Sequence, residues 1–134
     1  MKEYNKDKQN RLWLNYQLRT FGFAFNGLHK FFWSETKASI HTIAALLAVI
    51  TGLVLKISLF QWGLITLVIG LVFISELINS SIEKLVDMIS PEKNQQAGLI
   101  KDMAAGAVLF ASLIAIITGL LVFVPASIDW LHRQ

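Results

Sequence analysis

Acidic and amide side chains recur along one segment of the sequence at the spacing of an α-helix. Glu76, Asn79, Ser80, Glu83 and Asp87 fall within about 100° of one another on a helical wheel. The stripe begins directly after an apolar run, where an ionised carboxylate is costly unless it is paired, protonated or bound to a cation. We interpret it as a functional site, although Asp87 could instead be solvated beyond the membrane.

Further polar residues are expected at the same level of the membrane. Glu35 precedes the first apolar run, and Lys101 and Asp102 precede the last one. Mg²⁺ prefers oxygen ligands and typically uses one or two carboxylates plus substrate phosphates, and lysine offers a point charge to phosphate. The combination predicts a metal–nucleotide site at a membrane surface. The sequence contains no G-x-x-x-x-G-K-[ST] motif, so phosphoryl transfer here would not use a P-loop.

Three apolar segments must position these side chains. Residues 38–55, 57–75 and 103–128 contain no Asp, Glu, Lys or Arg, and a membrane span needs roughly 20 apolar residues. We predict spans over 38–57, 59–90 and 101–125, the second continuing into a cytoplasmic extension that ends before Pro91. The alternative, a buried hairpin in a soluble bundle, would need polar faces that the central turns lack.

The N-terminal segment has the pattern of an amphipathic helix. Apolar residues recur at steps of three and four, and we predict a surface helix over residues 8–34 in the headgroup layer. The stripe consists of Leu14, Leu18, Phe21, Phe25, Leu28 and Phe32.

Composition and charge narrow the function classes further. The 134 residues form a single membrane domain, 54% hydrophobic and only 16% charged, with no cysteine for a thiolate metal site or nucleophile. The net charge of +3 forms no continuous basic stripe, so we expect no nucleic-acid partner. Lys and Arg concentrate in residues 1–37 and 76–102, which places the N-terminus in the cytoplasm and the C-terminus outside.

These motifs resemble those of a known family. The resemblance covers the chain from about Tyr16 to Pro125 and is to the prokaryotic diacylglycerol kinases, small integral-membrane lipid kinases that include undecaprenol kinases. The motifs that carry it are Glu76-x-x-Asn79-Ser80-x-Ile82-Glu83-x-x-x-Asp87, Ser90-Pro91-Glu92 and Lys101-Asp102-Met103-Ala104-Ala105-Gly106-Ala107-Val108.

The resemblance implies a fold, a reaction and an assembly. The fold would be all-α, with three transmembrane helices and an N-terminal amphipathic surface helix, assembled as a homotrimer with active sites shared between protomers in the bacterial cytoplasmic membrane. The reaction would be MgATP-dependent phosphorylation of a lipid alcohol, diacylglycerol to phosphatidic acid, with undecaprenol as the alternative acceptor.

The resemblance also implies roles for individual residues. Glu76 would be the catalytic base, Glu35 and Glu83 the Mg²⁺ ligands, and Asn79 and Asp87 supporting residues. Lys37 and His41 are candidates for contact with the lipid headgroup, although His41 could instead be a hydrogen-bonded packing residue. The nucleotide-contacting positions would be Tyr16, Phe23, Glu92, Lys93, Asn94, Lys101 and Asp102.

The chain departs from the family pattern at three places. Asn94 stands where members often have His, Ser81 replaces Ala, and Thr36-Lys37-Ala38-Ser39 replaces an often basic or aromatic stretch. Two other function classes stay open from the residues alone. One is a small oligomeric ion- or proton-conducting protein, and the other is a non-catalytic subunit whose polar stripe holds helices together.

Overall fold

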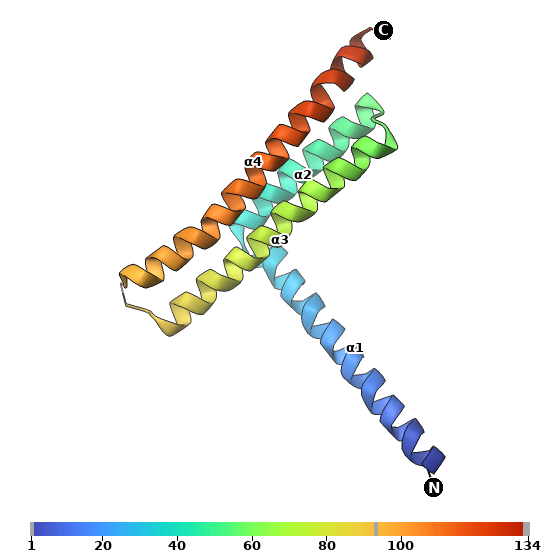
Figure 1. Ribbon diagram of the computed structural model, residues 1–134, viewed down its shortest axis with the longest axis vertical. Coiled ribbons are helices and arrows are strands. Elements are labelled where there is room, and N and C mark those ends of the chain that lie inside the picture. Colours follow the sequence, from blue (N-terminus) through green and yellow to red (C-terminus); the bar gives the residue numbers. More distant parts are fainter. Residues whose placement is uncertain (1, 93, 133–134) are drawn as a thin grey trace. The chain divides into compact units, whose positions relative to one another are not determined.

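Four α-helices follow one another along the chain (Figure 1). The structure is a computed structural model that describes residues 2–92 and 94–132, with the side chains of 2–11, 14, 15 and 34 outside the description. The helices are α1 (Lys2–Ser34), α2 (Thr36–Leu55), α3 (Leu59–Ile89) and α4 (Gln95–Leu131), and the described residues contain no strand. The chain divides into two units, Met1–Thr36 and Lys37–Gln134, which are described separately.

The second unit contains three helices that are long and apolar enough to cross a membrane, namely α2, α3 and α4. They contain 20, 31 and 37 residues, so they measure about 30, 46 and 55 Å at 1.5 Å per residue. Large apolar side chains on their outer faces are exposed, as a lipid-facing surface requires. The prediction of an all-α protein with three membrane-spanning helices is confirmed.

A tight connection joins α2 to α3. Lys56 adopts a left-handed backbone conformation with φ 53°, and Ser58 caps α3. The Ser58 hydroxyl accepts a bond from the Gln61 N–H at 3.3 Å, and the Gln61 side-chain oxygen accepts from the Ser58 N–H at 2.8 Å. This reciprocal capping box satisfies donors that a helix start leaves free. It therefore fixes the point where α3 begins.

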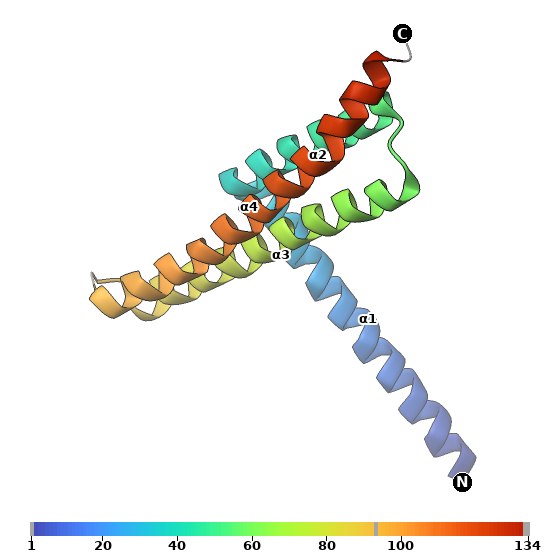
Figure 2. The same cartoon turned by 45° about the horizontal axis from the view of Figure 1, so that its top comes forward.

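The hairpin packs closely because Gly52 has no side chain. A Cβ built on Gly52 would lie 3.0 Å from both Ile57 Cδ1 and a ring carbon of Trp62. The apolar cluster beside it joins all three helices of the unit and consists of Leu55, Ile57, Ile65, Val122 and Ala126, with Trp62 and Trp130 packed against it. The core therefore sits toward the end of the unit that holds the α2–α3 connection and the C-terminal end of α4 (Figure 2).

Helices α3 and α4 run side by side in opposite directions in both views (Figures 1 and 2). On α4 the buried positions are Ala104, Ala111, Val122 and Ala126, which share one face. Small residues on this face allow close approach of the two helices. Ala104, Ala107 and Ala111 recur at helical spacing and form a small-residue face of α4. Ala104 and Ala111 are buried inside the chain, whereas Ala107 is exposed.

The α3–α4 connection lies at the other end of the unit. Helix α3 ends at Ile89, directly before Ser90 and Pro91, as the sequence predicts. Asn94 caps α4, and its Oδ1 accepts from the backbone N–H groups of Gln96 at 2.9 Å and Ala97 at 3.4 Å. This cap fixes the residue at which α4 begins.

Helix α1 belongs to the first unit. It runs without a break through Gly22 and Gly27, and Phe21, Phe23 and Phe25 are exposed on it. Leu14, the first residue of the predicted apolar stripe, lies outside the described side chains. The helical state of this segment is confirmed, and its position on a membrane surface stays a prediction.

Candidate active site on helix α3

One face of α3 is buried along most of its length, and its buried side chains change from apolar to polar halfway along the helix. Ile65, Val68 and Val72 fill the first part, and Glu76, Asn79 and Ser80 continue the same face. Only 1%, 2% and 5% of these three polar residues is exposed. Burial of polar groups without partners is costly, so a polar core segment indicates a function other than packing.

Three atoms of this polar segment have no hydrogen-bond partner within the described part of the chain. They are Oε1 of Glu76, Oδ1 of Asn79 and the hydroxyl of Ser80. Ser80 lies on the predicted stripe but received no role from the sequence, and its burial distinguishes it from the exposed Ser81. Unsatisfied buried acceptors are places where a proton, a cation or a donor from a second molecule would be stabilised.

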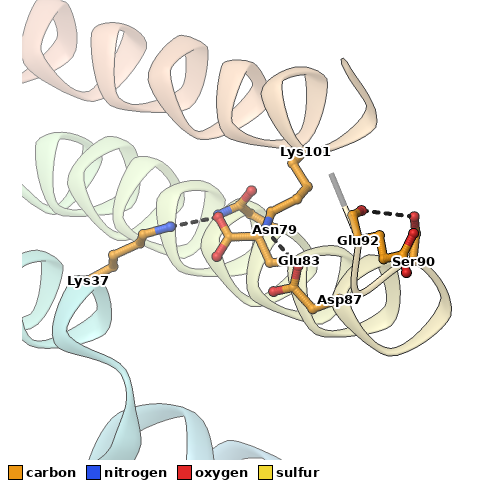
Figure 3. A network of polar contacts seen from close by, with 7 residues as sticks. All are labelled: Lys37, Asn79, Glu83, Asp87, Ser90, Glu92 and Lys101. Atoms are coloured by element: carbon orange, nitrogen blue, oxygen red, sulfur yellow. Dashed lines mark hydrogen bonds and ion pairs between the residues drawn. The ribbon is translucent and has the colours of Figure 1, made fainter. Parts of the chain in front are cut away.

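Glu83 is held by two side chains from different helices. Lys37, near the start of α2, donates to Glu83 Oε1 at 2.6 Å, and Asn79 Nδ2 donates to the same oxygen at 3.1 Å (Figure 3). The other oxygen, Oε2, is engaged by neither of these bonds. The contact with Lys37 joins residues 46 positions apart in the sequence and sets the start of α2 level with Glu83.

A second ion pair joins α4 to the end of α3. Lys101 Nζ lies 2.8 Å from Asp87 Oδ1, and the Ser90 hydroxyl donates to the Glu92 carbonyl at 3.4 Å (Figure 3). A cavity of about 400 Å³ opens beside this pair. Its lining includes Asp87, Glu92, Asn94 and Lys101, so the structure brings together four residues to which the resemblance assigned nucleotide contact or support. This volume suits a small-molecule ligand.

The remaining predicted site residues are placed as follows. Tyr16, Phe23 and Glu35 belong to the first unit, with Tyr16 and Phe23 exposed, and Lys93 lies outside the described residues. Asp102 is exposed at the start of α4, and His41 is half-buried on α2. A metal site shared by Glu35 and Glu83 therefore stays a prediction.

The donor atoms around Glu83 suit a hard divalent cation. The unpaired Asn79 Oδ1 lies one helical turn from the Glu83 carboxylate, so an amide and a carboxylate oxygen are neighbours. Glu76 lies two turns from Glu83, about 10 Å along the axis. No three His, Asp or Glu side chains converge within the described residues. Glu83 and Asn79 fit Mg²⁺ as an incomplete set that phosphates and water would complete.

The chain was compared with known proteins, and the match includes the polar face of α3. The family profile of prokaryotic diacylglycerol kinase matches residues 22–123. The chain belongs to the prokaryotic diacylglycerol kinase family. The match contains the whole polar face of α3, the α3–α4 connection and Lys101, whereas Tyr16 lies before it.

Individual relatives extend this result. An undecaprenol kinase of Bacillus subtilis (strain 168) is 36% identical over 121 residues, which cover 90% of this chain and 97% of the relative. A diacylglycerol kinase of Escherichia coli (strain K12) is 34% identical over 101 residues, which cover 75% of this chain and 83% of that kinase. The resemblance read from the motifs is confirmed, and this member of the diacylglycerol kinase family is similar to relatives with two different lipid acceptors in their names.

Proposed function

We propose that this diacylglycerol kinase family member transfers the γ-phosphoryl group of ATP to the hydroxyl of a membrane lipid. The observation that carries the proposal is the buried polar segment Glu76–Asn79–Ser80, set within the part of the chain that matches the family. The lipid oxygen forms a bond to the γ-phosphorus, the bond from that phosphorus to the β,γ-bridging oxygen breaks, and ADP leaves. Such transfer depends mainly on positioning and electrostatic stabilisation.

The register of α2 against α3 supports a site at the membrane surface. Helix α2 has 20 residues, about 30 Å, which equals the thickness of the hydrocarbon core. Because Lys37 at its start contacts Glu83, Glu83 lies at the surface if α2 spans the membrane. Glu76 then lies about 10 Å deeper. A lipid hydroxyl reaches this depth from within the bilayer, and ATP arrives from water.

Each residue of the site takes a distinct part in this mechanism. Glu76 accepts the proton of the lipid hydroxyl as general base, and Asn79 orients Glu76 or a phosphate oxygen. Lys101 offsets negative charge on the transferring group. Glu35 and Glu83 are the residues that would hold Mg²⁺, which would neutralise phosphate charge. We expect the nucleotide in the cavity that Asp87, Glu92, Asn94 and Lys101 line. Lys93, Asp102, Tyr16 and Phe23 are the further nucleotide-contacting positions that the resemblance to the family implies.

Two lipid alcohols are candidates for the acceptor. Diacylglycerol is the acceptor in the family's name, and its product would be phosphatidic acid. Undecaprenol is the second candidate because the relative of that name aligns with 90% of this chain. We place the protein in a bacterial cytoplasmic membrane as a homotrimer, with the N-terminus and the α3–α4 connection on the side that contains ATP.

The test is a phosphorylation assay on the purified protein in lipid–detergent mixed micelles with radiolabelled ATP and Mg²⁺. We expect label in the lipid fraction with diacylglycerol or with undecaprenol, and the ratio of the two rates assigns the acceptor. ATP consumption without labelled lipid, or no ATP consumption with either lipid, would contradict the proposal. Ion flux in liposomes without ATP would support the conducting protein instead.

A further inference from the structure

The Glu83 carboxylate forms an ion pair with the ammonium group of Lys37. Lys37 Nζ lies 2.6 Å from Glu83 Oε1, and the two side chains are 52% and 28% exposed. The pair is therefore partly accessible to water, and the lysine side chain can move without unpacking a helix. The pair links the start of α2 to α3 at the level of the candidate metal site (Figure 3).

The same carboxylate is the proposed ligand of a divalent cation. An ammonium group and Mg²⁺ both require carboxylate lone pairs, and their positive charges repel each other at contact distance. Asn79 Nδ2 already donates to the oxygen that Lys37 occupies, so Oε1 has little capacity for a further partner. A cation that binds Glu83 therefore meets an unfavourable charge unless Lys37 withdraws.

We propose that Lys37 competes with the divalent cation for Glu83 and so sets the cation concentration at which this site fills. In the ligand-free protein its ammonium group holds the Glu83 carboxylate in place, and it leaves Oε1 when the cation binds. The inference rests on the proposed function, in which Glu83 is a ligand of Mg²⁺. It makes Lys37 a positioning residue, separate from its predicted contact with a lipid headgroup.

The size of the effect follows from the exposure of the pair. Partly exposed ion pairs contribute little to stability, so removing the lysine charge should lower the cation concentration for half-saturation by about two- to fivefold. If the Lys37–Glu83 pair were much stronger, millimolar divalent cation would not bind Glu83. If the pair were fully solvated, Lys37 would not compete with the cation. Because a cation bound to the folded state raises its thermal stability, the midpoint of unfolding reports binding without catalysis.

The experiment compares Lys37→Met, Lys37→Gln and Lys37→Arg with the wild type in detergent. Thermal unfolding is followed during titration with Mg²⁺ alone, and binding of Mn²⁺ alone is measured by the electron paramagnetic resonance signal of the free ion. We expect Lys37→Met and Lys37→Gln to lower the unfolding midpoint in EDTA and to shift both titrations to lower metal concentration. Lys37→Arg should leave the titrations near those of the wild type. Lys56→Met, at the opposite end of α2, is the matched control for loss of one positive charge.

The outcomes separate this inference from the proposed function. Titrations of the Met and Gln variants that match the wild type, or that shift to higher metal concentration, would overturn the competition. So would the same shift in a Glu83→Gln background, where the shared carboxylate is absent. If the shift occurs as expected but the wild type phosphorylates no lipid alcohol, the proposed function fails and the competition stands.

Discussion

Glu76, the proposed general base, is a buried carboxylate on α3. It is 1% exposed, and its Oε1 has no partner within the described residues. Glu76→Gln preserves volume but removes the capacity to accept the proton. We expect lipid phosphorylation to fall by a factor of about 10² to 10⁴, the usual contribution of a general base.

Nucleotide binding separates this role from a structural one. Because the base acts only as the barrier is crossed, Glu76→Gln should bind MgATP with nearly unchanged affinity, as measured by calorimetry alongside turnover. Retention of more than half of the wild-type turnover would show that Glu76 is not the base. A parallel loss of nucleotide binding would indicate that the substitution disturbs the fold of the site.

The two predicted metal ligands should respond differently from Glu76. Glu35→Ala and Glu83→Ala are expected to raise the Mg²⁺ concentration for half-maximal activity and the KM for MgATP, in addition to lowering the rate. Asp129→Ala is the matched control. Asp129 is an exposed acid near the C-terminal end of α4, and no role in the site is proposed for it. Activity is titrated with Mg²⁺ at fixed ATP. Unchanged Mg²⁺ dependence in both variants would remove these two residues from the metal site.

At the scale of elements, the α2–α3 hairpin depends on a close approach at Gly52. A Cβ there would lie 3.0 Å from Ile57 Cδ1 and 3.0 to 3.1 Å from two carbons of the Trp62 ring. The ring cannot yield as easily as the end of a flexible chain, so Gly52→Val should destabilise the protein by about 1–3 kcal/mol through overpacking.

A second glycine of the same hairpin provides the control for this prediction. A Cβ on Gly63 would meet nothing within 4 Å. Gly63→Val should therefore leave the unfolding midpoint within a few degrees of the wild type, whereas Gly52→Val lowers it. Thermal unfolding in detergent measures both. Equal midpoints for the two variants would mean that the hairpin opens to accommodate the added side chain.

At the scale of the whole molecule, the chain separates two groups that the proposed reaction would bring together. Lys101 pairs with Asp87, which lies 11 residues beyond Glu76 on α3, about 16 Å along the axis. A base and a phosphate-binding lysine this far apart do not meet at one phosphorus atom unless a side chain moves far or a second protomer contributes. The separation favours the predicted trimer with shared sites.

An apolar groove offers a surface for such a neighbour. It has a volume of about 440 Å³ between α3 and α4 and includes Ile78, Ile82, Met103, Ala104 and Ala107. Ala107, the exposed member of the small-residue face, lines it. Small residues permit close contact between membrane helices, so this groove is where we expect an adjacent protomer to pack.

Mixing two inactive variants tests the shared site. Glu76→Gln and Lys101→Ala are each expected to be inactive, and reconstitution of the two together should restore part of the activity if base and lysine come from different chains. Crosslinking verifies that mixed oligomers form, and each variant reconstituted with itself is the control. Mixed oligomers without recovered activity would place both groups within one chain.

Local patterns were enough to predict the helices. The absence of charge in residues 38–55, 57–75 and 103–128 predicted the three apolar helices, because the backbone of a membrane span must satisfy its own hydrogen bonds. Ser90 before Pro91 predicted that the second span would end at residue 90, before Pro91, and α3 ends at Ile89. The polar stripe was also readable, since residues three and four apart share a helix face.

Partners across helices were not readable, because the register between two helices depends on packing between residues distant in the sequence. Lys37 was predicted to face a lipid headgroup, and the structure pairs it with Glu83, 46 residues away. Asn94 was predicted to contact nucleotide, and its Oδ1 caps α4 while the residue lines the cavity. Thus the amino-acid sequence determined which faces are polar, and only the tertiary structure decided which side chain each carboxylate meets, because side-chain distances across the bundle follow from how the helices pack.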